Sequence, residues 1–159
     1  MSKHEEKTNV MRVLDSKKVE YTSYCYVDTP TTNGVEVAKI LGQNPADVFK
    51  TLVTTSKSGT NYVFVIPVEE ELDLKKAAKA AGEKSVEMLK SKELLPLTGY
   101  VHGGCSPIGM KKAFKTFIDI SAESRDKIIF SAGKIGYQVE IRLSELSKVL
   151  EFSLEDLTV

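Results

Sequence analysis

The stretch that most constrains this chain is 99–112, which reads GYVHGGCSPIGMKK and contains four glycines, one proline and two adjacent lysines. Glycine accepts positive φ angles and lets a ligand approach the backbone, whereas proline fixes its own φ and favours an extended residue before it. The segment therefore predicts a loop of defined shape. Composition alone leaves two interpretations open: a tight connection between structural elements, or a cradle for a ligand.

Two familiar glycine motifs do not match this loop. The spacing from Gly104 to Gly109 is that of a phosphate-binding P-loop, but Met110 occupies the position of the required lysine. A serine-hydrolase elbow is excluded because Pro107 follows Ser106 and has no backbone N–H for an oxyanion hole. What remains is a nest for an anion or a developing oxyanion, formed by the backbone N–H groups of Gly103, Gly104, Cys105 and Ser106.

Length and charge narrow the class of protein. A chain of 159 residues is long enough for one domain with a hydrophobic core, and we expect one soluble domain over 1–159. With 22 basic and 22 acidic residues the net charge is zero, so nucleic-acid binding would need a local patch. No apolar run approaches the roughly 20 residues of a membrane span, and the polar first residues are no signal peptide. We therefore expect a cytoplasmic protein that does not contact membranes.

The two cysteines, Cys25 and Cys105, are expected to be free thiols, because an untargeted chain meets a reducing compartment. A zinc site would require His102 and Cys105 to meet Cys25 and His4 from three distant segments. Structural zinc sites normally have paired short ligand spacings instead. We therefore predict no metal and no cofactor.

Apolar periodicity, caps and turn residues predict a mixture of helices and strands. The uninterrupted apolar run 62–66 predicts a strand that is covered on both faces. Helices are expected at 8–17, between Asn33 and Gly42, in a short turn from Pro45, at 74–81 behind Asp73, from about 92, and at 143–149 with Ser144 as a cap. Strands are expected at 19–27 up to a turn at Pro30, and at 52–55, 62–68, 86–88, 117–120, 128–132 and 137–142. The acidic tail after these elements is expected to end the domain.

Five segments carry a family resemblance: 41–45 (LGQNP), 49–53 (FKTLV), 72–76 (LDLKK), the loop 99–112, and 131–134 (SAGK). In type and order they closely resemble the YbaK/EbsC family, which is similar to the editing insertion of bacterial prolyl-tRNA synthetases. The resemblance extends over about 10–150. It implies a single α+β domain around a mixed, strongly curved, barrel-like sheet surrounded by helices.

The same resemblance implies an activity. Members of this family are trans-acting aminoacyl-tRNA deacylases, and the best-known branch removes cysteine from Cys-tRNA(Pro) or Cys-tRNA(Cys). In that branch the thiol of the substrate attacks its own ester and cyclises, so no Ser-His-Asp set is needed. The implied partners are the 3′ end of a mischarged tRNA and, through the same likeness, prolyl-tRNA synthetase.

Carried over by residue, the resemblance implies that Lys50 is the functional lysine. The loop from Gly103 to Gly109 is implied to hold the charged 3′ end of the tRNA. The remaining positions that the resemblance assigns to substrate binding are Tyr24, Tyr26, Thr51, Gly103, Gly104, Cys105, Ser106, Pro107, Gly109, Ser131, Gly133 and Lys134. Lysines at 75, 76, 79, 111, 112 and 115 become candidates for contacts with the tRNA backbone.

Three positions depart from the family pattern. Tyr26 stands where close relatives often have histidine, Cys105 where they usually have an aliphatic residue, and Gln138 where many have aspartate. These departures leave the amino-acid specificity open. Three alternatives also remain: Cys105 acting as a nucleophile, a relative that binds tRNA or a synthetase without catalysis, and a thiol-redox protein.

The functional hypothesis depends on one spatial expectation. Lys50 lies where a short helix is expected to give way to a strand, far in sequence from the glycine loop. If it binds the same ligand as the loop, its ammonium group and the loop amides must converge on a common cavity.

Overall fold

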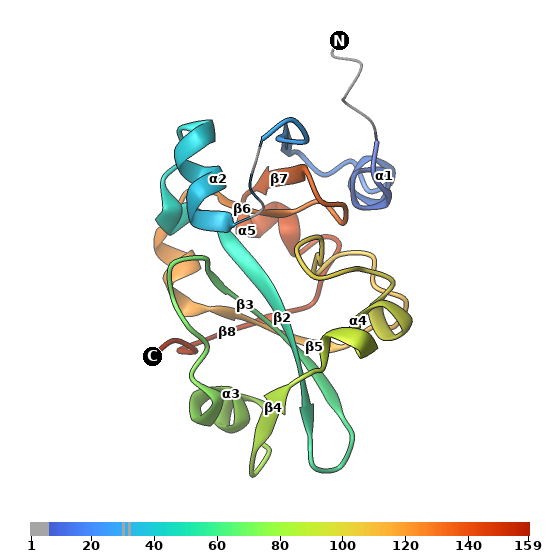
Figure 1. Ribbon diagram of the computed structural model, residues 1–159, viewed down its shortest axis with the longest axis vertical. Helices are drawn as coiled ribbons and strands as arrows, with labels where there is room; N and C mark the ends of the chain where they lie inside the picture. Colours follow the sequence, from blue (N-terminus) through green and yellow to red (C-terminus); the bar gives the residue numbers. More distant parts are fainter. Residues whose placement is uncertain (1–6, 30, 32) are drawn as a thin grey trace.

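The computed structural model describes residues 7–29, 31 and 33–159 (Figure 1). The strands are β1 (Thr22–Cys25), β2 (Phe49–Ser56), β3 (Asn61–Pro67), β4 (Val86–Met88), β5 (Lys115–Asp119), β6 (Ile128–Ser131), β7 (Tyr137–Ile141) and β8 (Ser153–Glu155). They form a mixed sheet of order β4-β2-β3-β5-β8 and an antiparallel sheet of order β1-β7-β6. The predicted α+β class is confirmed, with the strands divided between two sheets rather than placed in one barrel-like sheet.

The helices are short, and α2 and α3 begin and end at the residues expected to cap them. They are α1 (Asn9–Ser16), α2 (Gly34–Leu41), η1 (Pro45–Asp47), α3 (Leu74–Ala81), α4 (Ser91–Thr98), η2 (Ile120–Ser124) and α5 (Leu143–Leu146). The side chain of Asn33 accepts hydrogen bonds from two amides of α2, and Gly42 ends the helix with φ +69°. Asp73 and Gly82 act in the same way on α3.

One predicted cap is wrong. Arg142, not Ser144, precedes α5, and this helix has no side-chain cap hydrogen bond. The predicted turn at Pro30 lies outside the described residues. Within the described ranges no helix is long and apolar enough to cross a membrane.

The hairpin of β2 and β3 forms the centre of the molecule. Phe49 to Thr55 pairs antiparallel with Pro67 to Asn61, and β5 joins β3 in parallel on its other side. The apolar run of β3 is buried throughout, as predicted. Val63 and Val65 contact the cluster that includes α1, whereas Phe64 and Ile66 contact the cluster that includes α3.

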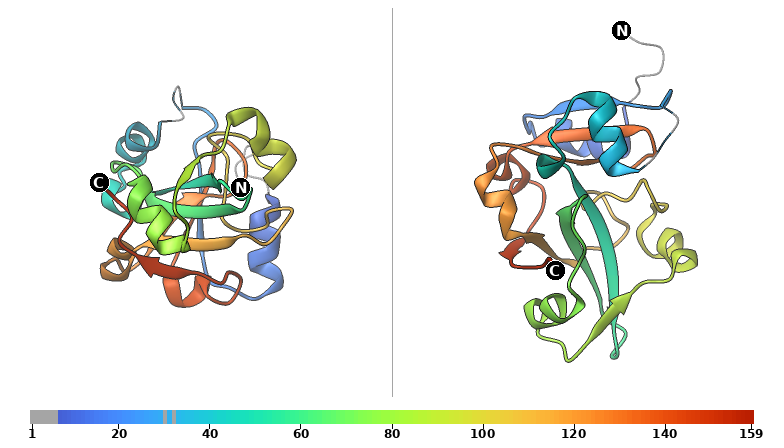
Figure 2. Two further views of the ribbon diagram at one scale, coloured as in Figure 1. Left: turned by 90° about the horizontal axis from the view of Figure 1, so that it is seen from below. Right: turned by 60° about the vertical axis from the view of Figure 1, so that its left-hand side comes forward.

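The two sheets meet where β2 begins. A parallel bridge pairs Val48 with Ile129 of β6, and the carbonyl of Val48 accepts a hydrogen bond from the amide of Val68 at 2.8 Å. The three-stranded sheet therefore lies across the first residues of β2, while α3 lies at the opposite end of the hairpin (Figures 1 and 2). This junction places the first residues of β2 beside β6 and β7.

The chain after α5, for which the sequence analysis expected no strand, is part of the core. Strand β8 pairs in parallel with β5, and Leu157 is fully buried. The carboxylate of Asp119 accepts a hydrogen bond from the amide of Leu157 at 3.0 Å. A short acidic segment can thus add a strand because Leu157 is buried and Phe152 and Leu154 are partly buried against the core.

We expect Leu157→Ala to lower the free energy of unfolding by about 2–5 kcal/mol, because the substitution removes a buried side chain and leaves a cavity. Val159→Ala is the matched control, since Val159 is 79% exposed at the same end of the chain. Urea denaturation monitored by circular dichroism measures both variants. Equal midpoints for the two variants would contradict a structural role for this segment.

Candidate active site

A cavity of about 290 Å³ lies at the junction of the two sheets. Its walls come from β2, β6, β7, the segment after β1 and the loop that follows α4. The predicted site residues that line it are Tyr26, Lys50, Thr51, Gly103, Cys105 and Ser131. Its volume is at the lower end of the range for small-molecule sites, so it suits a group about the size of an amino acid.

Lys50 brings an ammonium group to this cavity. It is the second residue of β2, lies opposite Ile66 in the ladder, and is half-buried. No hydrogen-bond or ion-pair partner of Lys50 is found in the part of the chain that the structure describes. A half-buried cation without a protein partner is available for an anionic ligand.

Thr51 adds polar groups that lack a partner. Its Oγ1 is buried and has no hydrogen-bond partner among the described residues. Strand β4 pairs with Thr54 to Ser56, and no strand among the described residues pairs with the first half of β2 on that side. The carbonyl of Val53 accepts a hydrogen bond from Leu89 on that side, and the peptide groups of Thr51, two residues earlier, point the same way. The cavity thus meets an open strand edge.

The loop after α4 begins with a tight turn. The amide of Gly104 donates to the carbonyl of Val101 at 3.0 Å, and Gly103 has φ +88° at the third position, as in a type II turn. Only glycine fits this position without strain. Because the amide of Gly104 is already bonded, it does not belong to the predicted nest. Gly103, the residue before it in the turn, lines the cavity.

The rest of the loop is held from inside. The hydroxyl of Tyr100 donates to the carbonyl of Ile108 at 2.5 Å, and the hydroxyl of fully buried Ser106 accepts from the amide of Ile108 at 3.3 Å. A Cβ at Gly109, where φ is +76°, would lie 2.9 Å from the hydroxyl of Tyr100. The loop is therefore a rigid structure rather than a flexible lid.

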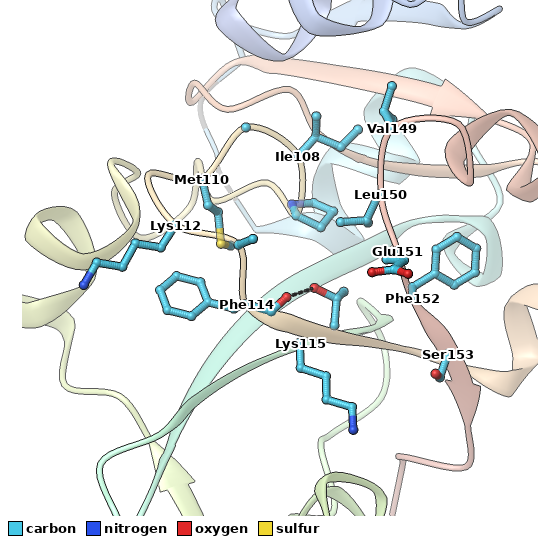
Figure 3. A pocket seen from close by; sticks show the side chains of 14 residues that line it. Ile108, Met110, Lys112, Phe114, Lys115, Val149, Leu150, Glu151, Phe152 and Ser153 are labelled. Carbon is cyan, nitrogen blue, oxygen red and sulfur yellow. Dashed lines mark hydrogen bonds between the residues drawn. The ribbon is translucent and has the colours of Figure 1, made fainter.

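The second half of this loop lines a different cavity. Pro107 and Gly109 face a hollow of about 800 Å³ between the loop and the segment before β8. Figure 3 shows this hollow, with Ile108 and Met110 on the loop side and Leu150 and Phe152 on the C-terminal side. The predicted loop residues are thus divided: Gly103 and Cys105 lie at the cavity of Lys50, and Pro107 and Gly109 do not.

Three further predicted residues lie near the site without lining it. Tyr24 pairs with Gln138 in the β1–β7 ladder, and its hydroxyl donates to the carboxylate of Glu140 at 3.1 Å. Gly133 packs against the ring of Tyr100, where a Cβ would come within 2.9 Å. Lys134 lies in the hairpin turn between β6 and β7, as predicted, with its ammonium 5.7 Å from the ring centroid of Tyr137.

Among the lining residues that the sequence analysis did not assign to the site, Gln138 and His102 carry polar side chains that could act on a ligand. Gln138 is buried, and its amide oxygen accepts a hydrogen bond from Nε2 of Gln43 at 2.9 Å. His102, considered only as a metal ligand, lines the cavity from the turn that precedes Gly104. The signal in the sequence was the Gly103-Gly104 pair that follows it, because adjacent glycines are typical of a turn, and turns lie at the surface.

Cys105 is a poor nucleophile in this environment. Its side chain is 8% exposed, and burial raises the pKa of the thiol to about 12. Thiolate, the reactive form, is therefore scarce at neutral pH. Among the described residues no three His, Cys, Asp or Glu side chains gather to hold a metal ion, and His4 of the considered zinc set lies outside those residues.

Comparison with known proteins assigns the class. The family model of the aminoacyl-tRNA editing domain matches residues 28–149, and the chain belongs to that family. EbsC of Enterococcus faecalis, named as a candidate Cys-tRNA(Pro)/Cys-tRNA(Cys) deacylase, is 48% identical over 140 residues, which cover 87% of this chain and 85% of EbsC. The resemblance drawn from the sequence motifs is thereby confirmed.

Two more distant relatives also have a link to prolyl-tRNA synthetase in their names. The proline–tRNA ligase of Shouchella clausii is 29% identical over 110 residues, which cover 69% of this chain and 19% of the ligase. A crystal structure of a candidate trans-editing enzyme for prolyl-tRNA synthetase has a TM-score of 0.80 at 20% identity, over 97% of this chain and 99% of that one. This last likeness establishes the shared fold.

We expect Cys105 to react slowly with iodoacetamide at pH 8. A thiol with a pKa of about 12 has about 10³-fold less thiolate at that pH than an unfolded cysteine. The alkylation rate should rise about tenfold per pH unit while the protein stays folded. Mass spectrometry that resolves the Cys105 peptide from the Cys25 peptide measures this, and equal Cys105 rates in native and urea-unfolded protein would contradict it.

Proposed function

We propose that the protein is a trans-acting aminoacyl-tRNA deacylase that removes the amino acid from mischarged tRNA, with Cys-tRNA(Pro) as its preferred substrate. The observation that carries this proposal is one small cavity in which the ammonium of Lys50 lies beside the Thr51 hydroxyl, both without a partner among residues 7–29, 31 and 33–159. Membership of the editing family and the 48% identity to EbsC support it. The proposed active unit is the domain 1–159, acting in the cytoplasm alone or with prolyl-tRNA synthetase.

The substrate bond explains why so few catalytic groups suffice. An aminoacyl ester is already activated, so catalysis requires orientation of the ester and stabilisation of the tetrahedral oxyanion. Lys50 supplies a compact cation for the terminal phosphate or the oxyanion, and the turn at Gly103 supplies backbone close to the ligand. With cysteine as the amino acid, the substrate thiol attacks the carbonyl carbon and the bond to the ribose oxygen breaks. The ribose oxygen takes the thiol proton, and the amino acid leaves as its cyclic thioester.

The other predicted site residues have supporting roles in this proposal. Tyr26, Thr51, Cys105 and Ser131 form the wall around the amino acid. Tyr24 supports the wall from the neighbouring strand. The remaining residues keep the glycine loop and the adjacent hairpin in shape, and they are Gly104, Ser106, Pro107, Gly109, Gly133 and Lys134.

The surface that meets the tRNA backbone is proposed to be on the loop side of the molecule. Lys111 and Lys112 are exposed directly after the glycine loop. Lys76 is instead bonded to Asp156 at 3.0 Å and to the carbonyl of Thr158 at 2.7 Å. Helix α3, which carries Lys76, also lies at the end of the hairpin away from the start of β2 (Figure 1). The lysines of α3 are therefore poorer candidates for tRNA contacts.

We expect Lys50→Ala to lower deacylation of Cys-tRNA(Pro) by about 10²–10³-fold, the loss typical of removing one oxyanion-stabilising group. Lys57→Ala, in the exposed loop between β2 and β3, is the matched control for loss of one positive charge. Release of labelled cysteine at saturating enzyme measures the rate, and circular dichroism checks the fold.

The same assay decides between catalysis and binding alone. Full deacylation by the folded Lys50→Ala variant would refute the role of Lys50. Absence of deacylation by the wild type on a panel of mischarged tRNAs, with and without prolyl-tRNA synthetase, would favour a protein that only binds tRNA or the synthetase.

A further inference from the structure

His102 occupies a defined position at the mouth of the cavity. It is the second residue of the turn closed by the hydrogen bond from the amide of Gly104 to the carbonyl of Val101, and Gly103 lines the cavity beside it. The imidazole is exposed to solvent and also lines the cavity. No hydrogen-bond or ion-pair partner of the imidazole is found within the described ranges. The ring nitrogens are therefore open to water and to a ligand.

The other ionisable groups of the described cavity wall are unsuited to accept a proton at neutral pH. Burial raises the pKa of the Tyr26 hydroxyl, and burial raises the pKa of the Cys105 thiol to about 12, so both groups stay protonated. Lys50 is assigned to the terminal phosphate or the oxyanion in the proposed function, and not to the role of a base. Helix α4 and strands β6 and β7 contribute Leu94, Ser131 and Gln138, which do not titrate.

Imidazole is the side chain that most readily exchanges a proton between pH 5 and pH 8. A general base also needs access to the water that it activates, directly or through one further water. His102 meets both requirements, because it lies where the cavity opens to solvent and on a turn held by a backbone hydrogen bond.

We propose that His102 is the general base that activates water for hydrolysis of the aminoacyl ester, so that this protein also cleaves esters whose amino acid has no thiol. This inference rests on the proposed deacylase function. Water adds to the carbonyl carbon and passes one proton to a ring nitrogen of His102. The tetrahedral adduct then breaks its bond to the ribose oxygen, which takes the proton back. The products are the free amino acid and uncharged tRNA.

This assignment separates two routes in one cavity. A cysteine ester can be cleaved by attack of its own thiol. This route needs only the orientation of the ester that Lys50 and the loop provide. A serine ester of the same size has no such nucleophile, so its cleavage depends on water and on a base. His102 should therefore matter far more for serine than for cysteine.

The test uses the full chain with tRNA(Pro) charged with serine or with cysteine, at pH 5.5 to 8.0. Wild-type cleavage of the serine ester should rise with pH, because only a neutral imidazole can accept a proton from water. His102→Gln should lower that rate by about 10²-fold or more and remove the pH dependence, with a smaller effect on the cysteine ester. Added imidazole should restore serine release by His102→Ala. Val101→Ala, a change in the same turn at a residue that does not line the cavity, is the matched control.

The outcomes distinguish this inference from the function on which it rests. If wild type and His102→Gln cleave the serine ester equally with the same pH profile, the role of His102 is overturned and the deacylase function stands. Cleavage of the cysteine ester alone by the wild type also overturns it. Inactivity of the wild type on both esters overturns both proposals.

Discussion

The contact on which the site depends is the bridge between the two sheets. Val48 pairs with Ile129 and accepts a hydrogen bond from Val68, so the chain enters β2 in contact with both sheets. Val48 and Ile129 are each 2% exposed. Because this junction is buried, the direction of β2 is set, and Lys50 and Thr51 are presented to the space beside β6 and β7. The bridge therefore fixes the two halves of the cavity wall relative to each other.

The second constraint is the rigidity of the glycine loop. Tyr100 contributes most to it, since its hydroxyl bonds to Ile108 and its ring lies against Gly133 of the neighbouring hairpin. A loop that is held by hydrogen bonds and by close glycine contacts loses little conformational freedom when a ligand binds. This suits a site that works mainly by orienting an activated ester. It also explains why the cavity can function with few polar groups.

Much of the local structure could be predicted because it depends on neighbours in the chain. Asn33, Asp73 and the glycines after each helix act through hydrogen bonds within a few residues. The apolar run of β3 likewise indicated burial on both faces. Contacts between residues far apart in the chain decided features that the local patterns did not indicate. The segment after α5 forms a strand because it pairs with the edge of β5 and because the side chain of Leu157 is buried there.

The sequence by itself determined that residues 99–112 form a loop of defined shape, because this follows from residue types and short spacings. Through the family resemblance of its motifs, it also indicated the fold class and Lys50 as a candidate. Only the tertiary structure decided which candidates share a cavity. It divided the loop between two hollows, used the amide of Gly104 within a turn, and brought His102 to the mouth of the cavity. The physical reason is that a cavity wall is made by contacts between segments far apart in the chain, and their packing is not encoded in any one motif.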